Sequence, residues 1–166
     1  MTQPSLLSLL AVIAAACGTA PGNQDASALS RRDAVTAAVL ARDAPVPGLA
    51  ADLERWGYVA GTEARYRRGS RRLTTVTSRT LRFRTGSGAR AYVDMVGAHA
   101  SAYEGLGATS SRIPAGYLLS AGTCGCATEV PHYLAVVAAG RRVTWLEVGG
   151  RTVTPATVDR LLREVP

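Results

Sequence analysis

The residues with the most evident chemistry are two cysteines one glycine apart, Cys124 and Cys126. In an extended segment the side chains at positions i and i+2 point to the same side, and Gly125 lets the backbone bend until the two Cα atoms reach bridging distance. In an oxidising compartment this spacing favours a local disulfide. A strained bridge is easily reduced, so a redox role for the pair is one alternative, and two reduced buried thiols are another.

His132 is the residue near these cysteines that would matter for metal binding, since a metal ion needs three or four ligands. Structural zinc sites usually separate paired ligands by two or more residues, whereas a single glycine lies between Cys124 and Cys126. His132 follows Pro131 at the start of a predicted strand, where a surface position explains it. We therefore predict no metal site and no bound cofactor.

Motifs for other catalytic chemistry are missing from the sequence. It contains no G-x-S-x-G, S-x-x-K or H-E-x-x-H pattern and no Lys that could form a Schiff base. The 12 carboxylates are scattered, with no spacing that pairs two of them as acid and base. No catalytic residue is predicted, and a non-enzymatic role is favoured.

Arginine gives the strongest surface signal. Between residues 65 and 90 there are nine Arg and no Asp or Glu. Strand-like alternation in this stretch predicts that Arg65, Arg67, Arg82 and Arg84 form one positive patch on the outer side of a hairpin. Guanidinium groups suit bidentate contacts with phosphate and carboxylate. A solvated face that only improves solubility is the alternative.

The N-terminal segment differs in composition from the rest of the chain. Residues 1–16 carry no charged side chain, so the net charge of +7 belongs entirely to the remainder. The apolar run Leu6–Ala16 would form a helix of roughly 16 Å, which is the length of a signal-peptide core and about half of a membrane's hydrocarbon thickness. We therefore predict export, with residues 1–16 removed as a signal peptide.

Cleavage after Ala16 leaves two interpretations of Cys17. An ordinary signal peptidase would release a secreted protein with one unpaired cysteine, whereas a lipoprotein peptidase would leave Cys17 for a lipid and Cys124 with Cys126 as an even pair. The segment Ala14-Ala15-Ala16-Cys17 resembles the lipobox of bacterial lipoproteins. This resemblance implies that Cys17 carries acyl chains such as palmitate, that residues 17–29 form a flexible tether, and that the protein is anchored to the outer face of the cell membrane.

Composition and location together define the expected partners. The absence of Lys beside 19 Arg indicates GC-rich codon usage, which is typical of an actinobacterial source. A basic stripe in a cytosolic protein would predict a nucleic-acid partner. Export redirects the expectation to anionic lipid, wall polymer or an acidic protein, besides the membrane that holds the anchor, and no nucleic acid is expected.

Residues 30–166 are sufficient for one domain, in which four helices and five strands are expected. The helices run from a cap at Ser30 to about Arg42, from Leu49 to Trp56 with Gly57 as the left-handed end, over 87–104 from a cap at Ser87, and from Thr154-Pro155 to the C-terminus. The strands are 58–67, 73–84, 117–121, 133–139 and 143–148, with a bulge near Thr77-Ser78 and a hairpin at Gly140-Arg141.

This order predicts an α+β fold with an antiparallel or mixed sheet of about five strands and helices packed on one face. With the charge and the leader, it favours an exported, membrane-anchored lipoprotein that binds anionic envelope components through its Arg-rich hairpin. Two other hypotheses stay open. One is an extracytoplasmic redox protein or enzyme centred on Cys124 and Cys126, and the other is a small-molecule carrier with a pocket between helix 87–104 and the sheet.

Overall fold

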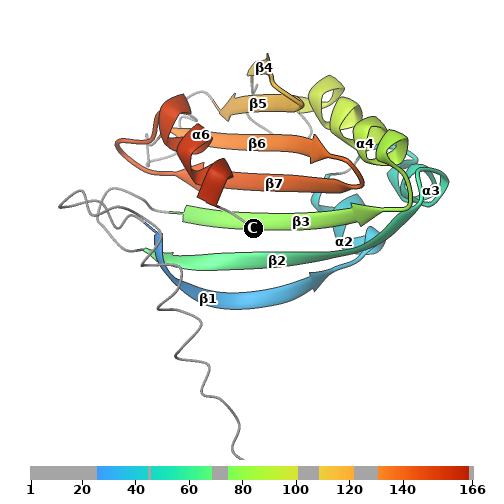
Figure 1. Ribbon diagram of the computed structural model, residues 1–166, viewed down its shortest axis with the longest axis horizontal. Helices are drawn as coiled ribbons and strands as arrows, with labels where there is room; N and C mark the ends of the chain where they lie inside the picture. The colour runs from blue at the N-terminus through green and yellow to red at the C-terminus, as the bar shows by residue number, and fades with distance from the viewer. Residues whose placement is uncertain (1–25, 45, 69–74, 101–108, 122–130, 165–166) are drawn as a thin grey trace, which may run out of the picture.

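The chain folds around one seven-stranded antiparallel sheet, shown in Figure 1, so the predicted α+β class is confirmed. The computed structural model describes residues 26–44, 46–68, 75–100, 109–121 and 131–164. Along the sheet the strands lie in the order β1-β2-β3-β7-β6-β5-β4. Their bounds are β1 Ala26–Val35, β2 Tyr58–Arg68, β3 Thr75–Phe83, β4 Thr109–Ile113, β5 Gly116–Ala121, β6 His132–Ala139 and β7 Arg142–Gly149.

The sheet consists of two meanders that meet in its centre. Strands β1 to β3 form one and β4 to β7 the other, and β3 pairs with β7 over eight consecutive residue pairs. Because β4 lies at the far edge, the chain must cross the sheet between β3 and β4, and helix α4 (Gly86–Ala98) lies on this connection.

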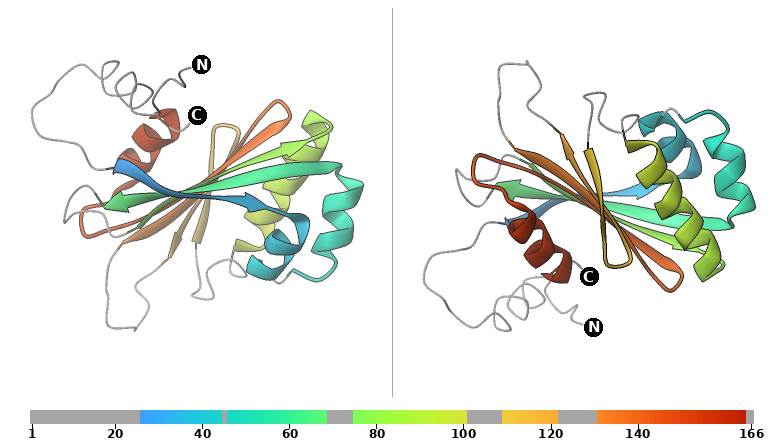
Figure 2. Two further views of the ribbon diagram at one scale, coloured as in Figure 1. Left: turned by 90° about the horizontal axis from the view of Figure 1, so that it is seen from below. Right: turned by 90° about the horizontal axis from the view of Figure 1, so that it is seen from above.

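Helices pack on both faces of the sheet, as Figure 2 shows, whereas the sequence predicted one face. Helices α2 (Ala37–Asp43), α3 (Leu49–Arg55) and α4 cover what we call the three-helix face. Helix α6 (Pro155–Glu164) packs on the other, the α6 face. The central strands supply apolar side chains to both: in β7, Val143 belongs to the three-helix core and Leu146 to the α6 core. The expectation of one covered face was wrong because buried central strands need not alternate apolar with polar.

The two strands that the sequence missed, β1 and β4, are the edges of the sheet. The predicted helix from Ser30 is wrong, because this segment pairs with β2 in β1, with Asp33 opposite Glu63. Helix α2 begins only at Ala37, where the Thr36 hydroxyl accepts a hydrogen bond of 3.2 Å from the Val39 N–H. Strand β4 is short, polar and mostly exposed, so it has no hydrophobic pattern. Sheet pairing, a tertiary contact, decides both segments.

Element ends in the rest of the fold follow local chemistry. Thr154 caps α6 as predicted, since its hydroxyl accepts from the Thr157 N–H at 3.3 Å. Helix α4 is capped by Thr85 rather than Ser87, and it ends at Ala98 rather than 104. The predicted bulge in β3 is wrong: β3 pairs regularly, and the irregularity lies in β2 between Tyr58 and Ala60.

Candidate functional site

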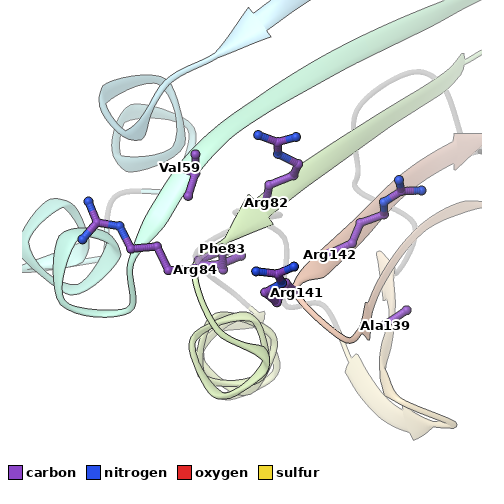
Figure 3. Close-up of a pocket in the computed structure, with 7 residues that line it drawn as sticks. All are labelled: Val59, Arg82, Phe83, Arg84, Ala139, Arg141 and Arg142. Atoms are coloured by element: carbon purple, nitrogen blue, oxygen red, sulfur yellow. The ribbon is translucent and has the colours of Figure 1, made fainter.

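Four arginines gather around an open pocket of about 530 Å³ at one end of the sheet, drawn in Figure 3. Among the described residues, no Asp or Glu lines it. We call this site the arginine pocket. Its lining residues are Val59, Arg82, Phe83, Arg84, Ala139, Arg141 and Arg142.

Three chain segments that are distant in sequence build the pocket: the start of β2, the end of β3 and the β6–β7 hairpin. Backbone hydrogen bonds join them. The Arg84 N–H donates to the Gly57 carbonyl at 2.8 Å, and the Phe83 N–H donates to the Arg141 carbonyl at 2.9 Å. Gly57 and Gly140 have φ of 72° and 57°, a region that glycine enters without strain. The tight turns at these glycines therefore present the arginines from a fixed backbone.

The lining of the pocket includes a buried aromatic residue, and its rim is partly apolar. Phe83 is buried, and its ring centroid lies 5.6 Å from that of Tyr58 and 5.7 Å from that of Tyr92. Val59 at the rim is 49% exposed and is the large hydrophobic residue left exposed in the described part of the chain. The site thus combines one buried aromatic residue, Phe83, with exposed cationic side chains at the surface.

The charges in the pocket lack compensation. Arg82 on β3 lies directly opposite Arg142 on β7 in the antiparallel register. Side chains in this relation have Cβ atoms about 4.5–5.5 Å apart, and like charges there are destabilising. All four arginines are exposed, and none forms an ion pair with a carboxylate within the residues that the structure describes. An anion between them would relieve the repulsion and accept charge-assisted hydrogen bonds.

Two other arginines, Arg65 and Arg79 of the β2–β3 hairpin, have acidic partners. We call these arginines and their partners the paired-arginine network. The Nε of Arg65 donates to Glu63 Oε1 at 2.6 Å, and the Nε of Arg79 donates to Glu63 Oε2 at 2.6 Å. Arg79 also donates through Nη2 to Asp43 Oδ2 at 2.6 Å, and it stacks 4.7 Å from the ring centroid of Trp145. The network links the end of α2 to β2, β3 and β7, so it stabilises the fold.

The electrostatics of Glu63 follow from these contacts. Burial by itself would raise the pKa of its carboxyl, but the hydrogen bonds and positive charges of Arg65 and Arg79 outweigh burial and lower that pKa below 4.5. Burial also raises the pKa of the nearby Tyr58 hydroxyl to about 12, partly offset by Arg79. The Tyr58 hydroxyl donates to the Val35 carbonyl. Glu63 and Tyr58 therefore hold β1, β2 and β3 together.

The structure separates the four arginines that the sequence placed in one patch. Arg82 and Arg84 line the arginine pocket, while Arg65 belongs to the paired-arginine network on the three-helix face. Arg67 is in β2, but its side chain lies outside the described residues. The cause is that β2 and β3 bury opposite faces at these points: Tyr66 packs toward α6, whereas Leu81 packs toward the three helices.

Two pocket residues, Arg141 and Arg142, were not among the predicted site residues. The sequence did predict the hairpin at Gly140-Arg141 that carries them. Only the pairing of β3 with β7, however, brings them next to Arg82. Cys17, Cys124 and Cys126 lie outside the described residues.

Among the described residues, no three His, Cys, Asp or Glu side chains come together as a metal site requires. His132 instead lies with its Nε2 3.0 Å from Glu147 Oε1. Helix α4 packs Tyr92, Val93 and Val96 into the three-helix core. No described helix is long and apolar enough to span a membrane.

Comparison with known proteins adds information on the fold. No protein-family model matches the sequence, and no curated protein is significantly similar to it. Among solved structures, the fold is similar to the extracellular domain of PknH from Mycobacterium tuberculosis, with a TM-score of 0.53 and 13% sequence identity. The similarity covers 95% of this chain and 88% of the other. At this identity the comparison supports the architecture alone.

Proposed function

We propose that this protein is exported, anchored to the outer face of the cell membrane, and binds an anionic component of the cell envelope in its arginine pocket without catalysing a reaction. The observation that carries the proposal is the uncompensated pair of Arg82 and Arg142, flanked by Arg84 and Arg141. A fold tolerates such repulsion at little cost when a ligand supplies the missing charge.

Export and anchoring are supported by the N-terminal sequence. The run Leu6–Ala16 followed by Cys17 has the length and residue types of a lipoprotein signal. The similarity of the fold to an extracellular domain agrees with a location outside the cytosol. Changing Cys17→Ser should move the protein from the membrane fraction to the medium. Continued sedimentation with membranes would contradict the anchor.

Anion binding is tested with inorganic polyphosphate as a probe. The double variant Arg82→Gln/Arg142→Gln should raise the dissociation constant at least ~10-fold, since each charge-assisted contact is worth about 1.5–3 kcal/mol. Arg163→Gln removes the same kind of charge from α6, where it pairs with Asp159, and should leave the affinity unchanged. A loss of binding free energy in Arg163→Gln about half as large as in the double variant would mean that binding depends on net charge alone, since this variant removes one positive charge and the double variant removes two.

A further inference from the structure

A row of threonines lies next to the arginine pocket on the α6 face. Thr62 on β2 is opposite Thr80 on β3, and Thr80 is opposite Thr144 on β7. Directly opposed residues share a face, and strands are about 4.8 Å apart, so three hydroxyl-bearing side chains follow one another across the sheet. We call this set the threonine row.

The threonine row and the arginines belong to one surface. Thr80 and Arg82 are two residues apart on β3, as are Thr144 and Arg142 on β7, so these side chains point to the same side about 7 Å apart along the strands. Val76 and Leu146, which pack against α6, continue the same alternation. The row therefore lies between the area that α6 covers and the arginine pocket. Figure 1 shows α6 over one half of the sheet, and on this face no helix of the described residues covers the other half of β3 and β7.

The chemistry of this surface fits a ligand with two kinds of groups. Guanidinium groups take oxyanions such as phosphate through paired N–H donors. A threonine hydroxyl can donate one hydrogen bond and accept up to two, which matches the hydroxyl groups of sugars. The spacing of about 7 Å between the arginines and the threonine row is on the scale of one sugar unit and its phosphate.

The position of the pocket bears on whether a lipid is the source of the phosphate. Strand β1 begins at Ala26, opposite Arg68 at one end of β2, whereas Val59 and the arginines are at the other end. The eleven residues of β2 make these ends roughly 30 Å apart. Since Ala26 is nine residues after Cys17, the chain from an anchor at Cys17 would enter the sheet at the end away from the pocket.

We infer that the anion is a phosphate-bearing glycan, which places a phosphate between Arg82 and Arg142 and a neighbouring sugar on the threonine row. This inference rests on the proposed function, because it names the ligand class for the same pocket. Glycans and lipid head groups offer similar phosphates, but a glycan also has sugar hydroxyl groups that can hydrogen-bond to the threonine row.

The test measures binding of the mature domain to four probes: a phosphomannan, the same mannan after removal of phosphate, inorganic polyphosphate, and vesicles of phosphatidylglycerol. The protein should bind phosphomannan at least ~10-fold more tightly than the dephosphorylated mannan. The variant Thr62→Val/Thr144→Val keeps the β-branched shape and should weaken binding of phosphomannan ~5-fold or more, while binding of polyphosphate stays unchanged. Thr80 takes part in another interaction of the fold and is left unaltered.

The outcomes separate the two proposals. Two outcomes would overturn the glycan inference while anion binding through Arg82 and Arg142 stands. One is that phosphomannan binds no more tightly than the dephosphorylated mannan. The other is that Thr62→Val/Thr144→Val does not weaken binding of phosphomannan. Stronger, arginine-dependent binding to phosphatidylglycerol vesicles would replace the glycan with a lipid surface. If no anionic probe binds, the proposed function itself fails.

Discussion

The β2–β3 hairpin carries arginines on both of its faces, and the two groups differ in their partners. On the three-helix face, Arg65 and Arg79 share the carboxylate of Glu63, which is 4% exposed. At the arginine pocket, Arg82 lies directly opposite Arg142, and in the described part of the chain neither pairs with a carboxylate. The sequence prediction placed Arg65 and Arg82 in one patch. The ion pairs indicate that the first group stabilises the fold, and we propose that the second group binds a ligand.

The largest expected effect comes from breaking the paired-arginine network. Glu63→Gln removes a buried carboxylate and leaves Arg79, with a side chain 11% exposed, without one of its charge partners. We expect the free energy of unfolding to fall by roughly 3–5 kcal/mol. Denaturant titration measures it, and polyphosphate binding by the folded variant should be retained. A loss below about 1 kcal/mol would show that the network is not structural.

The next prediction concerns how the stability that Glu63 contributes depends on pH. Because the pKa of Glu63 is lower in the folded protein than its ordinary 4.5, this carboxylate stabilises the fold above pH 4.5, and the contribution is lost as pH falls through the folded pKa. Denaturant titrations at a series of pH values below 4.5 should show a steeper loss in the native protein than in Glu63→Gln. Parallel curves would contradict this.

A smaller effect concerns the backbone of the arginine pocket. Gly57→Ala forces a residue with Cβ into φ of 72° and brings that Cβ 3.1 Å from the Cβ of Arg84. The left-handed conformation costs an ordinary residue about 1–2 kcal/mol. Thermal unfolding should report this loss, together with weaker polyphosphate binding from the displaced Arg84. Gly48→Ala also has a positive φ, of 79°, but no neighbour within 4 Å, and should lose stability without loss of binding.

The smallest change in stability is expected to have the opposite sign. Arg142→Gln removes one of two opposed like charges and should raise the free energy of unfolding by about 0.2–1 kcal/mol in the absence of ligand. The same variant should lose affinity for polyphosphate. Stability that falls instead would mean that Arg142 has a stabilising role in the unliganded fold.

Local patterns in the sequence were sufficient for much of the fold. Helices α3 and α6, the strands β2, β3, β5, β6 and β7, and the hairpin before Arg142 were predicted nearly at their observed bounds, because apolar periodicity and turn residues act locally. The edge strands β1 and β4 were missed because they form by pairing with a neighbour. The segment around Ser30 shows this most clearly, since its polar residues fit a helix cap until β2 lies beside it.

The candidate site was predictable only in part, for a related reason. Alternation within one strand predicts which residues share a side, and it correctly separated Arg82 from Leu81. Alternation does not show which side of a strand packs against the three-helix core and which against the α6 core. Since the sheet has a core on each face, Arg65 and Arg82 point in opposite directions, and Arg141 and Arg142 join the pocket only through the β3–β7 pairing.

The comparison of the two arginine groups is tested most directly by measuring the dissociation constant for inorganic polyphosphate in two single variants of equal charge change. Arg142→Gln should raise the dissociation constant ~10-fold or more, because it removes a ligand contact. Arg65→Gln should leave it unchanged, because Arg65 already pairs with Glu63 on the other face. Equal losses in both variants would contradict the account, since binding would then depend on net charge rather than on the arginine pocket.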